Sequence, residues 1–87
     1  MYGIGMGGQE GTHMAAPRHC LKDAPTMESM PIDATVGLAR VIPILDEKSI
    51  RREELLQHEL GAGERILFKT ANSDTSWDTD VFDENYV

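Results

Sequence analysis

Two histidines six positions apart are the side chains best suited to chemistry in this sequence. His13 and His19 lie on either side of Pro17, and Cys20 directly follows His19. Imidazole changes its charge near neutral pH, so histidines serve as metal ligands and as proton carriers. A catalytic zinc site usually takes three protein ligands, so two loop histidines would need help from elsewhere. The spacing leaves two interpretations open, a metal or catalytic site and a pair of solvent-exposed loop histidines.

Several other patterns resemble sites but have simpler explanations. Residues 3–8 match G-x-G-x-x-G, yet no strand precedes them and Pro17 interrupts any helix after them, so we expect a flexible lead-in. Glu54 and His58 are four apart, which fits a solvated helical face with a side-chain attraction better than a metal pair. Cys20 has no visible group to orient and activate it as a nucleophile. The acidic residues of 74–80 lack the spacing of a calcium loop.

The histidine loop resembles the metal-dependent cyclase family, which includes the bacterial kynurenine formamidases and isatin hydrolase. The family signature is His-x-Gly-Thr-His-x-Asp-Ala-Pro-x-His. The residues that match it in register are Gly11, Thr12, His13, Ala16, Pro17 and His19. Residues 30–33, 37–45, 63–70 and 72–86 are also similar to later family segments, so the resemblance covers nearly all of residues 9–87.

The resemblance implies a hydrolase of carbon–nitrogen bonds in small-molecule amides. The leading substrate is an aryl formamide, with N-formylkynurenine converted to kynurenine and formate in tryptophan catabolism. The family uses a divalent metal, commonly zinc or manganese, and forms homodimers or larger oligomers. Its fold is α/β, of a swivelling β/β/α type, so this chain should contribute part of a mixed sheet, one crossover helix and long loops.

Residue roles follow from the resemblance as well. His13 would be a metal ligand, and His19 would be the catalytic proton shuttle. Gly11, Thr12 and Pro17 would shape the loop: Pro17 would fix it so that the two imidazoles converge, and Gly11 would allow the backbone to approach the metal closely.

Two positions depart from the signature. The first metal histidine of the family falls on Gln9, whose amide oxygen is a weak ligand, and the aspartate falls on Ala15, which offers no donor. The family draws a further His and Glu from a later part of a much longer chain. We therefore expect a central segment that binds metal weakly or not at all and is inactive alone. A non-catalytic relative and a small acidic interaction module are the alternatives.

The elements that must position the loop are read from the hydrophobic pattern. We expect one partial domain over 1–87, with a glycine-rich lead-in (1–11), the motif loop (12–33), a strand–helix–strand region (34–71) and an acidic loop (72–87). Strands are predicted at 38–45 and 65–71, and a helix at 49–60 with Ser49 as its N-cap. Pro43 places the first strand at an edge or a bulge. Trp77, Phe82 and Tyr86 are isolated apolar anchors.

Length and charge limit the remaining possibilities. A chain of 87 residues has a marginal core, and a single cysteine excludes an internal disulfide. The net charge of −7, without a basic stripe, argues against partners such as nucleic acid or anionic membranes. No stretch has the length of a membrane span, and the first residues do not resemble a signal peptide, so we expect a cytoplasmic protein.

Overall fold

The computed structural model describes residues 1–76 and 79–87, so the predicted anchor Trp77 lies outside the described residues. The chain divides into two compact units, Met1–Thr35 and Val36–Val87, which we describe separately. Within the described residues, no helix is long and apolar enough to cross a membrane.

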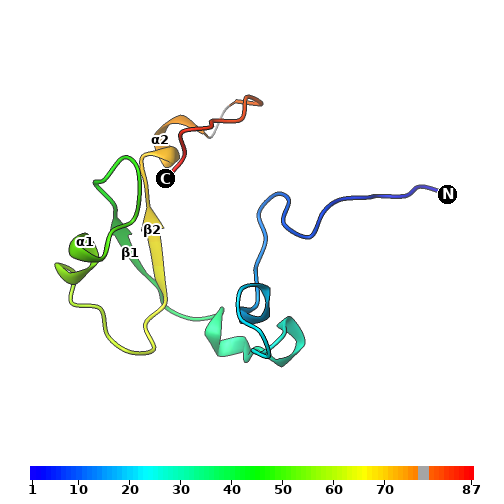
Figure 1. Cartoon of the computed structure of the whole chain (residues 1–87), viewed down its shortest axis with the longest axis horizontal. Helices are drawn as coiled ribbons and strands as arrows, with labels where there is room; N and C mark the ends of the chain where they lie inside the picture. Colours follow the sequence, from blue (N-terminus) through cyan, green and yellow to red (C-terminus); the bar gives the residue numbers. More distant parts are fainter. Residues whose placement is uncertain (77–78) are drawn as a thin grey trace. The chain divides into compact units, whose positions relative to one another are not determined.

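The second unit contains a two-stranded parallel sheet. Strands β1 (Arg40–Pro43) and β2 (Ile66–Lys69) pair in parallel, with Arg40 opposite Ile66 and Pro43 opposite Lys69. Helix α1 (Arg52–Leu56) lies in the connection between them, and the short helix α2 (Asn72–Thr75) follows β2 (Figure 1). The predicted strand–helix–strand crossover and the α/β class are confirmed. The two described strands run parallel to each other, so the described sheet is parallel and not mixed. Helix α2 lies within residues 72–87, which were expected to form a loop.

Helix α1 is shorter than the predicted 49–60, for reasons visible at both ends. Ser49 is not the N-cap, because its backbone N–H donates to Oδ1 of Asp46 at 3.1 Å and the turn continues to Arg51. At the other end, Glu59 adopts a left-handed backbone conformation with a φ of 48°, which a helix cannot contain. The apolar stripe that predicted the helix therefore extends beyond it.

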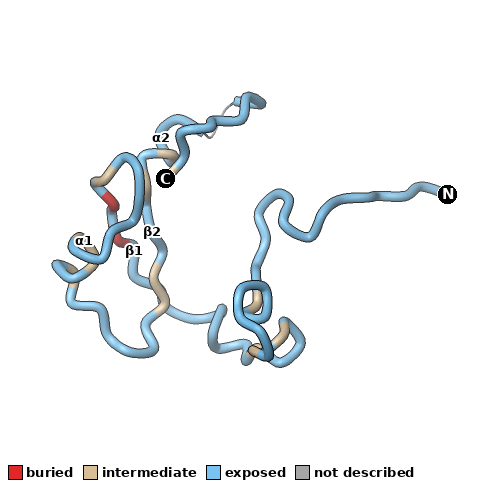
Figure 2. Tube along the Cα trace, in the orientation of Figure 1, coloured by how far each residue is buried: buried red, intermediate tan, exposed pale blue. Residues whose placement is uncertain are grey.

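Among the described residues of this unit, the fully buried side chains lie on one face of the sheet. Ile42 and Ile44 are the buried hydrophobic residues, only 1% and 5% exposed (Figure 2). Side chains alternate between the two faces of a strand, so Val41 points the other way and is 58% exposed. Its partner across the sheet, Leu67, is equally exposed. Parallel sheets are normally covered on both faces, so the Val41 and Leu67 face is unusual in being open.

Pro43 lies where a strand tolerates it. The backbone N–H groups of Arg40 and Ile44 donate to the carbonyls of Arg65 and Lys69, at 2.9 and 2.8 Å. Successive N–H positions alternate between the two edges of a strand, so the Pro43 nitrogen faces away from β2. The predicted edge position is confirmed, because β2 is the only neighbour of β1 in the described sheet.

The first unit consists of turns and short 3₁₀ helices. These helices are η1 (Pro17–His19), η2 (Met27–Ser29) and η3 (Ile32–Ala34). Three prolines in residues 12–33 prevent a longer helix, as expected. The backbone N–H of Arg18 donates to the carbonyl of Pro25 at 3.1 Å, which closes the turn formed by residues 18–25.

Candidate functional site in the histidine loop

A tight turn brings Gln9 and Gly11 to His13. The N–H of Glu10 donates to the Gly7 carbonyl at 3.3 Å, and the Glu10 carboxylate accepts from the N–H of Gly7 at 2.8 Å. Gly11 then adopts a φ of 65°, a left-handed conformation that glycine reaches without steric cost. The chain reverses at this point, so residues before and after the turn can meet.

The His13 imidazole is held at both ring nitrogens. Nδ1 lies 2.8 Å from the carbonyl oxygen of Gly11, and Nε2 lies 2.9 Å from Oε1 of Gln9. The sequence indicated all three residues, but in other roles: His13 as a metal ligand, Gln9 as a weak substitute ligand and Gly11 as a loop-shaping glycine. Their direct hydrogen-bonded arrangement was not predicted, because it depends on the left-handed conformation of Gly11 and on the preceding turn.

His19 belongs to a separate element of the same loop. Pro17 begins η1, and its carbonyl accepts from the N–H groups of Cys20 and Leu21 at 3.1 and 2.9 Å. His19 is exposed, and its ring makes no hydrogen bond or ion pair within the described residues. The structure thus links Gln9, Gly11 and His13 by hydrogen bonds and does not link His19 or Thr12 to them.

The donors of this loop do not complete a metal site. Nowhere in residues 1–76 and 79–87 do three or more His, Cys, Asp or Glu side chains gather closely enough to hold an ion. The loop offers one imidazole nitrogen and one neutral amide oxygen, whereas Ala15 offers no side-chain donor. A catalytic zinc usually needs three protein ligands, so the residues present do not fit this group by themselves.

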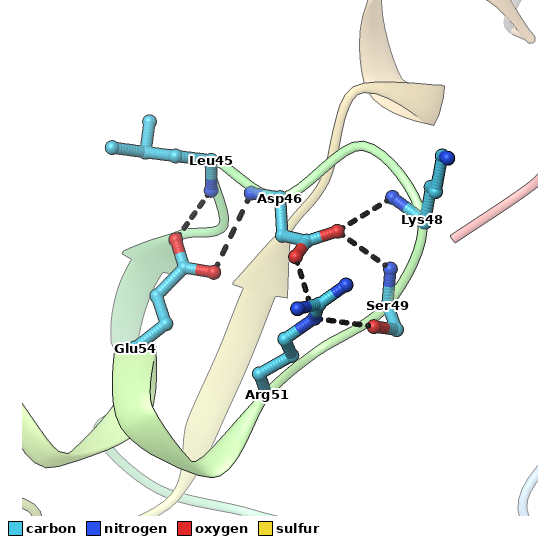
Figure 3. A network of polar contacts seen from close by, with 6 residues as sticks. All are labelled: Leu45, Asp46, Lys48, Ser49, Arg51 and Glu54. Carbon is cyan, nitrogen blue, oxygen red and sulfur yellow. Dashed lines mark hydrogen bonds and ion pairs between the residues drawn. The ribbon is translucent and has the colours of Figure 1, made fainter.

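A second polar cluster connects α1 to the end of β1 (Figure 3). The Asp46 carboxylate accepts from the N–H groups of Lys48 and Ser49 at 2.8 and 3.1 Å and pairs with Arg51 Nε at 2.8 Å. The two backbone donors, followed by the positive charge of Arg51, hold the pKa of Asp46 below its ordinary value. Glu54 accepts from the N–H groups of Leu45 and Asp46. The hydrogen bonds and the ion pair of this cluster all join groups of residues 45–54, so they hold the turn and its role is structural.

The Glu54 and His58 pair is likewise not a metal pair. The Glu54 carboxylate already accepts hydrogen bonds from backbone N–H groups. His58 contacts Arg40 through its backbone carbonyl, which accepts a hydrogen bond from Arg40 Nη1 at 3.0 Å. Arg40 also pairs with Glu64 at 2.7 Å. The N–H of Gly61, and then the charge of Arg40, hold the pKa of Glu64 below its ordinary value.

The acidic tail forms a hollow that the sequence did not predict. The N–H of Val87 donates to Oδ1 of Asn72 at 2.9 Å, which brings the tail back to α2. Phe82 and Tyr86 contact each other edge to face, with ring centroids 6.0 Å apart. The cavity has a volume of about 530 Å³, and its lining includes these two rings with Asp80 and Asp83. Both aromatic side chains remain mostly exposed, so the hollow is open.

Comparison with known proteins identifies the class. The chain belongs to the family described as "Putative cyclase", which matches residues 2–87. It is similar to a kynurenine formamidase of Salinibacter ruber, 35% identical over an alignment of 71 residues that covers 77% of this chain and 34% of that protein. It is also similar to the kynurenine formamidase of Bacillus cytotoxicus, 37% identical over 62 residues, 71% of this chain and 30% of that protein. The chain therefore spans about a third of the length of these relatives, and no solved structure matches it.

Proposed function

We propose that this chain is the histidine-loop segment of a metal-dependent hydrolase of the kynurenine formamidase type. The family match over residues 2–87, with kynurenine formamidases at about 35% identity, is the observation that carries the proposal. The substrate would be a small aryl formamide such as N-formylkynurenine, hydrolysed to kynurenine and formate. The surrounding domain would be of the swivelling β/β/α type and would assemble as a homo-oligomer in the cytoplasm.

The proposed catalytic roles divide between the two histidines. His19 is exposed and its ring contacts no polar group among the described residues, so it is available to take a proton from an attacking water and deliver it to the leaving nitrogen. His13 would be a ligand of a zinc or manganese ion, with Gln9 as a weak neighbouring donor. Because the donors of the loop are too few, the other ligands would come from outside residues 1–87, and the isolated chain would neither bind the metal firmly nor turn over the amide.

The test is a chimera in which this chain replaces the matching third of the Salinibacter ruber kynurenine formamidase. With Gln9→His and Ala15→Asp, we expect the chimera to hydrolyse N-formylkynurenine in the presence of zinc or manganese. Adding His19→Ala should lower kcat by about 10²–10⁴-fold, the usual contribution of a general acid–base. His58→Ala is the matched control, because within the described residues His58 makes its hydrogen bonds through its backbone N–H and carbonyl and not through its ring.

Four outcomes count against parts of the proposal. A correctly folded chimera without activity would refute the hydrolase assignment. Equal activity of the His19→Ala and His58→Ala variants would remove His19 from the mechanism. Full activity with Gln9 and Ala15 left in place would show that the two departures do not weaken the site, and micromolar or tighter zinc binding by the isolated chain would refute the missing-ligand argument.

A further inference from the structure

The hollow of the acidic tail is a cavity with two aromatic rings in its lining. It lies within the second unit, where the Val87 N–H donates to Oδ1 of Asn72 and brings the tail back to α2 (Figure 1). Oδ1 of Asn72 also accepts from the Thr70 hydroxyl at 3.1 Å, which ties the same amide to the end of β2. The volume of about 530 Å³ is sufficient for a small molecule.

The two rings are arranged so that ring faces remain open to solvent. Phe82 and Tyr86 meet at an interplanar angle of 63°, with their centroids 6.0 Å apart, so they are not stacked on each other. Both residues are mostly exposed. The face of an aromatic ring carries partial negative charge and attracts a cation that lies within about 6 Å of the ring centroid. A cation in this hollow can therefore contact ring faces.

The charge around the rings has the sign that suits a cation. Asp80 and Asp83 line the same cavity, and residues 70–87 contain no lysine or arginine. Oδ1 of Asp83 accepts from the Asn85 N–H at 2.8 Å, a contact that uses one of the two carboxylate oxygens. A carboxylate can accept several hydrogen bonds, so Asp83 can still accept from a ligand. An anionic ligand would be repelled by both aspartates.

The donor set favours an organic cation over a metal ion. Calcium takes about six to eight oxygen ligands, several of them from carboxylates, whereas two aspartates line this cavity. In the part of the chain that the structure describes, no three His, Cys, Asp or Glu side chains gather closely enough to hold an ion. Aromatic rings do not supply such ligands, but they are the groups with which proteins recognise quaternary ammonium ions.

We propose that this hollow binds small organic cations of the alkylammonium class. Phe82 and Tyr86 would contact the alkyl groups on the nitrogen, and Asp80 and Asp83 would supply the opposite charge. Because the rings are open to solvent, the affinity should be modest, with a Kd of roughly 1–10 mM. The site lies outside the histidine loop, and none of its residues takes part in the proposed hydrolysis.

The experiment is an NMR titration of the 87-residue chain with choline. The matched ligand is dimethylbutanol, in which carbon replaces the quaternary nitrogen and the charge is lost. We expect choline to shift the ring protons of Phe82 and Tyr86, and its methyl protons to show nuclear Overhauser contacts with both rings. Choline should bind roughly fivefold more tightly than dimethylbutanol, because the two ligands share their shape and differ in charge.

Substitutions separate the contribution of the rings from that of the carboxylates. Phe82→Leu and Tyr86→Leu keep an apolar side chain, so each should weaken choline binding roughly two- to fivefold and leave dimethylbutanol binding unchanged. Tyr2→Leu removes an exposed ring from the other unit and is the control. Asp83→Asn should also weaken choline binding, whereas Glu53→Gln, which removes the same charge from an exposed position of α1, should not.

Equal affinity for choline and dimethylbutanol would overturn the proposal, because the hollow would then bind apolar groups without regard to charge. Unchanged choline binding in both ring variants, or Overhauser contacts of choline only with residues outside 70–87, would overturn it as well. The contacts in the parent chain test the site without any substitution, and amide spectra of residues 36–76 show whether each variant keeps its fold. Activity of the chimera does not enter these measurements, so the hydrolase assignment and this site can fail separately.

Discussion

Single residues of this chain have sharply unequal importance for stability. Ile42 is 1% exposed, whereas its neighbour Val41 is 58% exposed on the opposite face of β1. Side chains on the two faces of one strand belong to the same paired strand and differ in what they bury. Substitutions at these two positions therefore separate core packing from strand formation.

We predict that Ile42→Ala destabilises the second unit by about 2–3 kcal/mol, the lower part of the range for such truncations, because its partly open surroundings can collapse. Val41→Ala should cost less than about 1 kcal/mol, since that side chain is largely solvated already. Urea denaturation followed by circular dichroism measures both. Equal losses in the two variants would contradict the one-faced core.

The histidine loop was only partly predictable at this scale. The residue types and their register with a family signature identified Gln9, His13 and His19 as positions of interest. The hydrogen bonds that join Gln9 and Gly11 to His13 depend on a left-handed φ at Gly11 and on the preceding turn. Those are conformational details that a residue pattern does not encode, because glycine permits many conformations.

At the scale of elements, local side-chain contacts decide where each helix begins and ends. The β-branched run of residues 38–45 predicted β1 well, because strand preference and burial act together there. The limits of α1 were missed, because Asp46 draws the N–H groups of Lys48 and Ser49 into a turn. Helix α2 was missed because its residues, Asn-Ser-Asp-Thr, favour caps and turns over helix interiors.

The turn after β1 should make the second unit sensitive to acid. The folded-state pKa of Asp46 is lowered from its ordinary value of 3.8, mainly by the backbone N–H groups of Lys48 and Ser49. The stabilisation from its carboxylate is therefore fully present above pH 3.8 and is lost as the pH falls through the lower folded-state pKa. The pKa of Glu64 is likewise lowered from its ordinary value of 4.5, first by the N–H of Gly61 and then by Arg40. Its carboxylate therefore also adds stability that is lost in acid.

We predict that the thermal midpoint of the parent chain declines as the pH is lowered from roughly 6 to 3. Asp46→Asn should lower the midpoint near neutral pH and make its decline in acid shallower, because the substituted side chain no longer takes up a proton. Asp74→Asn, in the first turn of α2, is the control and should leave the slope unchanged. A parallel shift of the Asp46→Asn curve at every pH would contradict this assignment.

At the scale of the whole molecule, the dominant feature is how little of the apolar surface is covered. Only Ile42 and Ile44 are buried hydrophobic residues in the described chain, and Val41 and Leu67 form an open sheet face. The Salinibacter ruber kynurenine formamidase, which is similar to this chain, is more than twice as long, because the aligned 71 residues make up only 34% of it. In the proposed full enzyme, this open face is where further structure would pack.

Leu67→Lys tests that expectation. In the 87-residue chain we predict a change within about 0.5 kcal/mol, because a solvated side chain is replaced by another. In the chimera with the Salinibacter ruber enzyme, the same lysine would have to lose its water, so we expect loss of folded, active protein. Glu53→Lys, at an exposed position of α1, is the control and should be tolerated in both. A fully active Leu67→Lys chimera would mean that this face stays in solvent.

The parallel pairing of β1 and β2 also has a kinetic consequence. Parallel strands cannot be joined by a tight hairpin, so the whole of residues 44–65 must form a closed loop before Arg40 can meet Ile66. The entropy of closing that loop is lost before any pairing contact compensates for it. Helix α1 and the Asp46 turn need only local contacts, so they can form before the strands pair. They then reduce the number of conformations that the connection must lose when β1 and β2 meet. The rate of sheet formation should therefore depend on the connection as much as on the strands themselves.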